Sequence, residues 1–142
     1  MRLLAQIGLA LALCTMSLTP ARAEEPLVSA QQVITSQIQA FLSDDADTAY
    51  GFASPQIRAL FPDKERFFAM VKKSYQPVYR PGNFAFGRFK VSDDTQTVLQ
   101  EVLVTGGEGA DWTAVYELRR QPDGQYKING VQLLPNTTSK GI

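Results

Sequence analysis

Histidine is absent from the 142-residue chain, and the single cysteine, Cys14, lies in an apolar stretch near the N-terminus. These absences exclude Ser-His-Asp triads and most zinc and copper sites. A phosphate-cradling glycine motif is also missing, because Gly106-Gly107-Glu108-Gly109 lacks the spacing of a nucleotide loop and is typical of a hairpin connection. The sequence therefore predicts no metal, no cofactor and no catalytic residue that a motif would identify.

Neither sign of charge is in excess, since 14 basic residues stand against 14 acidic ones. Two of the basic residues, Arg2 and Arg22, precede residue 24, so the chain beyond that point is slightly acidic. Long runs of like charge are lacking, which argues against nucleic acid and anionic membrane surfaces as partners. The expected partner is a small ligand or a protein of unknown identity.

Residues 1–23 have the pattern of a cleaved export signal. Arg2 supplies the positive start, residues 3–18 are apolar, and Ala21-Arg22-Ala23 is a small-x-small cleavage signal. The apolar stretch is shorter than the roughly 20 residues that span a bilayer, which favours cleavage over a transmembrane anchor. We expect cleavage between Ala23 and Glu24, loss of Cys14 with the peptide, and a periplasmic or secreted protein with no membrane attachment.

The first half of the mature chain is predicted to be helical. After an extended leader over residues 24–27, Ser29-Ala30-Gln31-Gln32 matches a capping box and begins a helix that ends near Ser43. The apolar stripe of this helix consists of Ile34, Ile38, Phe41 and Leu42.

Capping residues predict three more helices. Asp44 or Asp45 can cap a short helix, and Ser54-Pro55 begins the next with proline at its first position. Pro62-Asp63 repeats this device for a helix from Lys64 to about Tyr75. Residues 76–82 contain Pro77 and Pro81 and are expected to form a non-helical connector to the sheet.

The second half is predicted to form antiparallel strands. Apolar residues at every second position from Trp112 to Leu118 indicate a strand with one buried face. Gln121-Pro122-Asp123-Gly124 then reverses the chain into a partner strand that continues to Leu134. The apolar alternation slips at Gly87, in a strand from Phe84 to Val91, and again at Gly130, which predicts two β-bulges.

A β-branched run from Thr95 to Thr105 has apolar residues on both faces, which predicts a central strand covered on both sides. Helices followed by four antiparallel strands predict one α+β domain over residues 24–135, with the helices packed on one face of a curved sheet. Residues 136–142 are expected to be a flexible tail.

This order of elements resembles the cystatin-like and nuclear transport factor 2-like cone, a fold that also hosts ketosteroid isomerases and polyketide cyclases. Several short motifs lie between Val33 and Leu134: Ser54-Pro55, Ile57, Phe61, Phe67, Met70, Tyr75-Gln76-Pro77-Val78-Tyr79-Arg80, Phe86-Gly87 and Gln121-Pro122-Asp123-Gly124 with Ile128. Together they are similar to an uncharacterised family of exported bacterial domains. That family has no assigned activity, so the resemblance implies no catalytic residues.

Tyrosines and arginines are the remaining candidates for ligand binding. These residues are Tyr79, Arg80, Arg58, Tyr75, Tyr50 and Tyr116. A tyrosine can also simply close the edge of a core with its hydroxyl in water. In the functional interpretation, Tyr79, Arg80 and Arg58 converge on a small anionic or phenolic ligand between helices and sheet.

Three functions stay open on the sequence alone. The leading hypothesis is a non-catalytic exported module that binds a small ligand or a protein. The second is an isomerase, cyclase or dehydratase of the ketosteroid isomerase type, which needs a carboxylate base inside the pocket. The third is a structural homodimer, in which Val115, Glu117 and Arg119 on the second face of the hairpin form the interface.

Overall fold

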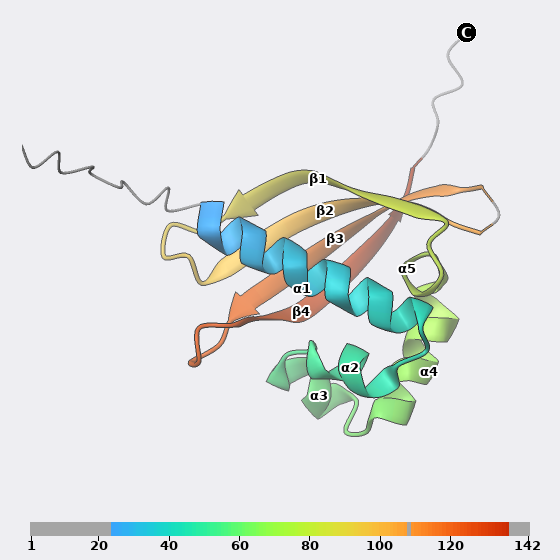
Figure 1. Cartoon of the computed structure of the whole chain (residues 1–142), viewed down its shortest axis with the longest axis horizontal. Helices are drawn as coiled ribbons and strands as arrows, with labels where there is room; N and C mark the ends of the chain where they lie inside the picture. The colour runs from blue at the N-terminus through green and yellow to red at the C-terminus, as the bar shows by residue number, and fades with distance from the viewer. Residues whose placement is uncertain (1–23, 108, 137–142) are drawn as a thin grey trace, which may run out of the picture.

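The computed structural model describes residues 24–107 and 109–136, and its helices precede an antiparallel sheet (Figure 1). The helices are α1 (Glu24–Leu42), α2 (Ala46–Gly51), α3 (Pro55–Leu60), α4 (Lys64–Ser74) and α5 (Gln76–Tyr79). The strands are β1 (Asn83–Val91), β2 (Thr97–Thr105), β3 (Asp111–Arg120) and β4 (Tyr126–Pro135). This confirms the α+β class. The expected export signal and most of the expected tail lie outside the described residues.

Helix α1 begins at Glu24, so the expected extended leader is wrong. Acidic Glu25 suits the positive end of the helix dipole, and Pro26 stands in the first turn, where backbone N–H groups have no helical partner. The Ser29 motif therefore lies inside the helix. None of the described helices is long and apolar enough to cross a membrane.

The shorter helices begin where their capping residues predicted. The side chains of Asp45, Ser54 and Asp63 each accept a hydrogen bond from a backbone N–H in the first turn of α2, α3 and α4. The connector after α4 is not wholly non-helical, because residues 76–79 form α5. Pro77 is tolerated there because it occupies the first turn of that helix.

The four strands form one sheet in the order β1-β2-β3-β4, and each neighbouring pair is antiparallel. Gly124 has φ of +86° in the β3–β4 turn, as the turn motif predicted. The register shifts between Phe86 and Phe89 on β1, and opposite Glu117 and Leu118 on β4. Both predicted bulges are thus present, the second with Asn129 as the extra residue.

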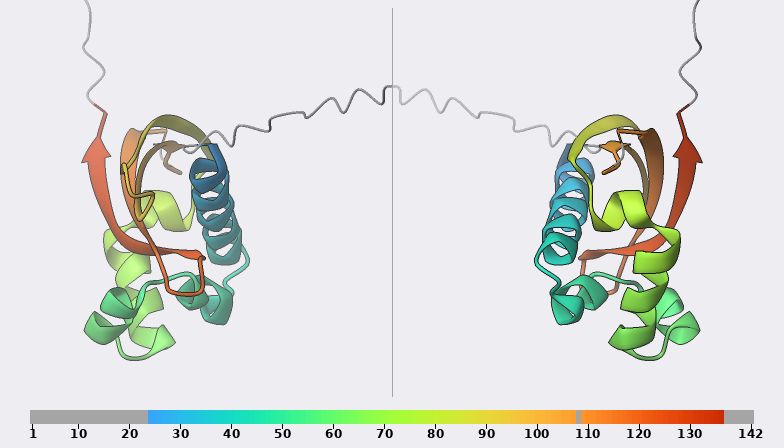
Figure 2. Two further views of the ribbon diagram at one scale, coloured as in Figure 1. Left: turned by 90° about the vertical axis from the view of Figure 1, so that its left-hand side faces the viewer. Right: turned by 90° about the vertical axis from the view of Figure 1, so that its right-hand side faces the viewer.

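One face of the sheet packs on α1 (Figures 1 and 2). Ile34, Ile38 and Phe41 of α1 are buried in a cluster with Val98, Val102, Ala114 and Leu118 of the strands. The other face stays open: on β2, Leu99 is 41% exposed and Leu103 is 45% exposed. The prediction that β2 is covered on both sides is therefore wrong, since no described helix lies over its second face.

Candidate functional site

An apolar hollow lies between α3, α4 and β4. It has a volume of about 420 Å³, which is within the range of small-molecule sites, roughly 300–1,000 Å³. Its walls are formed by Gln37, Phe41, Ala53, Ile57, Leu60, Phe61, Phe67, Met70, Val71, Ser74, Tyr75, Val78, Ile128, Gly130 and Val131. None of these residues carries a charge, and most are apolar. We call this hollow the α3–α4 cavity.

The bulge on β4 positions the α3 wall of this cavity. Asn129, the bulged residue, accepts a hydrogen bond from Ser54 Oγ (2.9 Å) and donates to Glu117 (3.3 Å). The backbone of Ile128 accepts from Ser54 N (2.8 Å) and donates to Phe52 O (2.8 Å). Since Ser54 also caps α3, these contacts fix the beginning of α3 against the edge of β4 and leave its end free to diverge.

The other end of α3 is less enclosed. None of its residues is buried, and Leu60 at the rim of the cavity is 68% exposed. Tyr50 holds the following turn by donating its hydroxyl to Phe61 O (2.6 Å). The rim is therefore open on the side where α3 meets α4.

Polar groups enter the cavity at three positions. Gln37 of α1 is only 3% exposed and donates its side-chain N–H to Ala49 O (3.1 Å). Tyr75 donates its hydroxyl to Val131 O (3.1 Å), and Ser74 is exposed at the rim. Tyr75 is the one sequence candidate that lines this cavity. These few polar groups can orient a ligand without supplying a formal charge.

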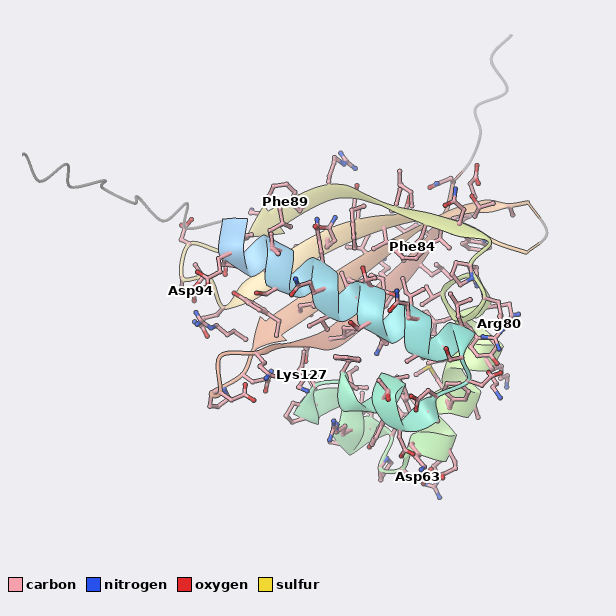
Figure 3. All side chains as sticks on the ribbon, viewed as in Figure 1. Asp63, Arg80, Phe84, Phe89, Asp94 and Lys127 are labelled. Atoms are coloured by element: carbon pink, nitrogen blue, oxygen red, sulfur yellow. The ribbon has the colours of Figure 1, made fainter. Side chains whose placement is uncertain are left out.

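Tyr79 and Arg80 lie together, and neither lines the cavity. Figure 3 shows Arg80 beside the end of α1. Asp44 accepts a hydrogen bond from the Tyr79 hydroxyl and forms an ion pair with Arg80 (2.8 Å). Arg80 also donates to Phe41 O and stacks on the Tyr79 ring at 4.0 Å. The hydrogen bond from Tyr79 and then the Arg80 guanidinium lower the pKa of Asp44. This cluster closes the C-terminal end of α1.

Arg58 does not join Tyr79 and Arg80, so the expected convergence of the three is wrong. Its guanidinium donates to Gly51 O (3.0 Å), a carbonyl that also accepts from Lys127 (2.7 Å), and it stacks on Tyr50 at 5.0 Å. Figure 3 shows Lys127 well separated from Arg80. The two arginines cap different helix ends, because carbonyls left free there attract cations.

Tyr116 is not near a cavity mouth as expected, because it is completely buried on the inner face of β3. Its hydroxyl has no hydrogen-bond partner in the described part of the chain. Burial raises the pKa of this hydroxyl. The alternation in β3 that identified the strand also required this position to face inward, so the tyrosine follows the strand pattern rather than a site.

Two buried glutamines were missed by the sequence prediction. Gln37 stands between Ile34 and Phe41 at helical spacing, and Gln100 interrupts the apolar alternation of β2. Gln100 donates to the Gly87 and Arg88 carbonyls (3.3 and 3.2 Å) in the β1 bulge. A polar residue inside an apolar stripe is the signal that could have identified both, since a buried amide needs a partner.

Comparison with known proteins places the chain in a family. A protein-family profile described as Domain of unknown function (DUF4864) matches residues 24–141. The chain belongs to this family. No curated protein and no solved structure matches it. The match to DUF4864 covers all of the described elements, and its description assigns no activity to the α3–α4 cavity.

Proposed function

We propose that this DUF4864 domain is a non-catalytic module that binds a small, uncharged and mainly apolar molecule in the α3–α4 cavity. The observation that carries the proposal is the lining: three phenylalanines, Met70 and several aliphatic side chains surround a few polar groups. An apolar hollow with sparse polar groups is the usual form of a small-molecule site. Burial of apolar ligand surface would supply the affinity.

The same lining disfavours the isomerase, cyclase or dehydratase hypothesis. A base that removes a proton from carbon must touch the substrate, and the usual base in such a pocket is a carboxylate with a raised pKa. Among the described residues, no carboxylate lines the cavity. Glu101 pairs with Arg88 on the outer face of the sheet (2.9 Å), and this pairing lowers the pKa of Glu101.

Binding is tested with N-phenyl-1-naphthylamine, an uncharged probe whose fluorescence rises in apolar sites. We expect saturable binding to the purified protein. Met70→Trp fills the cavity and should weaken binding at least about tenfold, or about 1.4 kcal/mol. Ala69→Trp is the matched control, because Ala69 is the exposed neighbour on α4. No saturable binding, or equal affinities for the two folded variants, would contradict the proposal.

Export is proposed as the context of this function. The family match begins at Glu24, which supports cleavage after Ala23. The expected N-terminus of the protein in the exported fraction is Glu24. N-terminal sequencing that finds Met1, or a lipid on Cys14, would contradict this expectation.

We also infer kinship with the nuclear transport factor 2-like cone. The support is a four-stranded meander that curves beside α1 (Figure 2). The α3–α4 cavity is lined by helices on one side and by β4 on the other. An experimental structure with a flat sheet would contradict the inference.

Self-association is the second candidate function, favoured by the open face of the sheet. Leu99, Leu103 and Leu134 are each more than 40% exposed, and all three lie on this face with Val115. Among the charged residues there, Arg119 pairs with Glu117 (3.1 Å) and Arg88 pairs with Glu101 within one protomer. A face with balanced charges can meet a second copy without net repulsion.

A further inference from the structure

We propose that the ligand of the α3–α4 cavity carries one hydrogen-bond donor, such as a hydroxyl, on an uncharged ring or chain, and that Gln37 receives this donor. The inference rests on the proposed function of the cavity. It adds the chemical class of the ligand and the residue that selects it. Gln37 is thereby assigned a specificity role.

The orientation of Gln37 follows from its one hydrogen bond. Its partner, the carbonyl of Ala49, can only accept, so the amide nitrogen must point toward Ala49 (3.1 Å) and the amide oxygen away from it. No described residue donates a hydrogen bond to that oxygen, and the oxygen is not sealed from solvent. Gln37 lines the cavity, and the proposal places its amide oxygen at the cavity wall.

A ligand that fills the cavity would exclude water from the Gln37 amide oxygen. Gln37 itself is only 3% exposed and lies on the same helix as the buried Ile34, Ile38 and Phe41. A polar atom that loses its hydration without gaining a partner costs free energy. A ligand donor on the amide oxygen would restore that interaction, and a ligand without a donor would leave it unmade.

The rest of the lining sets the ligand's charge. No lysine, arginine, aspartate or glutamate among the described residues lines the cavity, so a charged ligand would lose water and find no counter-ion. Tyr75 already donates its hydroxyl to Val131 O. The cavity thus offers acceptors and no free cation, which suits an uncharged donor and disfavours a carboxylate.

Three matched compounds separate these requirements: 1-naphthol carries a donor, naphthalene carries none, and 1-naphthoate carries a negative charge. Their dissociation constants are measured by displacement of N-phenyl-1-naphthylamine from the full chain. We expect 1-naphthol to bind about tenfold more tightly than naphthalene, as one hydrogen bond to a buried amide allows. We expect 1-naphthoate to bind about a hundredfold more weakly than 1-naphthol.

Gln37→Met, of similar length, tests the assignment directly. It should abolish the preference for 1-naphthol while leaving naphthalene affinity within about twofold of the original, because a methionine keeps the apolar contacts. Gln39→Met is the matched control, since Gln39 is exposed on the same helix and does not line the cavity. Gln39→Met should keep the full preference for 1-naphthol over naphthalene.

The outcomes distinguish this inference from the proposed function. If the probe binds but 1-naphthol and naphthalene compete equally, the donor requirement is wrong and the apolar site stands. If the preference survives in Gln37→Met, another residue receives the donor and the assignment is overturned. If Gln37→Met fails to fold, Gln37→Leu replaces it, with circular dichroism as the check. If the probe does not bind at all, the proposed function itself fails.

Discussion

At the scale of single residues, the hydroxyl of Tyr116 is a polar group that the fold buries without a partner among the described residues. Tyr116→Phe removes this oxygen and keeps the ring, so we expect the free energy of unfolding to rise by about 1 kcal/mol. Urea denaturation at pH 7 measures the change. Tyr75→Phe is the contrasting variant, because its hydroxyl donates to Val131 O, and it should lose stability.

The pH dependence of Tyr116 has a defined sign. Burial raises the pKa of its hydroxyl in the folded state, whereas an unfolded tyrosine titrates near pH 10. Ionisation of this hydroxyl therefore leaves the free energy of unfolding unchanged below about pH 10 and lowers it as the pH rises beyond that value. We expect Tyr116→Phe to lose less stability than the unaltered protein between about pH 10 and 11. Parallel loss in both proteins would show that the hydroxyl titrates normally.

Gly124 is the residue on which the β3–β4 turn depends. Its φ of +86° is a conformation that side chains with a branched Cβ resist. Gly124→Val should lower the free energy of unfolding by about 1 to 2 kcal/mol. Gly107→Val is the control, since a Cβ at Gly107 meets no atom within 4 Å and its φ is not positive. An unchanged thermal midpoint in Gly124→Val would contradict the assigned strain.

At the scale of elements, Arg80 joins α5 to the end of α1 through Phe41 O and Asp44. Arg80→Met should destabilise the protein by about 1 to 2 kcal/mol, because it leaves the last carbonyls of α1 without their cation. Arg66→Met is the control: its ion pair with Asp63 is exposed and lies within one helix (3.3 Å). The melting midpoints of the two variants are compared by thermal denaturation. Equal midpoints would show that Arg80 does not cap α1.

The cluster of Asp44, Tyr79 and Arg80 also predicts how the stability of the protein changes at acidic pH. The pKa of Asp44 is lowered in the folded state, first by the hydrogen bond from Tyr79. The Asp44 carboxylate therefore stabilises the folded state above the ordinary aspartate pKa of about 4, and this stabilisation is lost as the pH falls through the lowered pKa. Asp44→Asn should therefore flatten the stability profile below about pH 4. Asparagine also tolerates the positive φ of +51° at this position, so the variant isolates the charge.

At the scale of the whole molecule, the proposed self-association places the interface on the open face of the sheet. Static light scattering at micromolar concentration should find a dimer, and Leu103→Asp should shift it to monomer, because a charge in an apolar contact is costly. Leu42→Asp is the matched control, since Leu42 is 46% exposed at the end of α1. A monomer at every concentration, or a dimer unaffected by Leu103→Asp, would contradict an interface on this face.

Local signals in the sequence determined much of the fold. The caps at Ser54 and Asp63, the turn at Gly124 and the bulge glycines each act over a few residues, so the physical cause is contained in a short stretch. The alternation of apolar residues likewise identified β1, β3 and β4, and the β-branched run identified β2. The order of helices and strands then limited the architecture to α+β.

Only the tertiary structure decided which faces are covered and where a hollow remains. The β-branched run of β2 predicted two covered apolar faces, but Leu103 stays open because α1 can cover one side only. The α3–α4 cavity arises because the Asn129 bulge ties Ser54 to β4 and α3 diverges from that point. Arg58 and Arg80 were candidates for one site and instead cap different helix ends. Such contacts join residues dozens of positions apart, so no local pattern of residues encodes them.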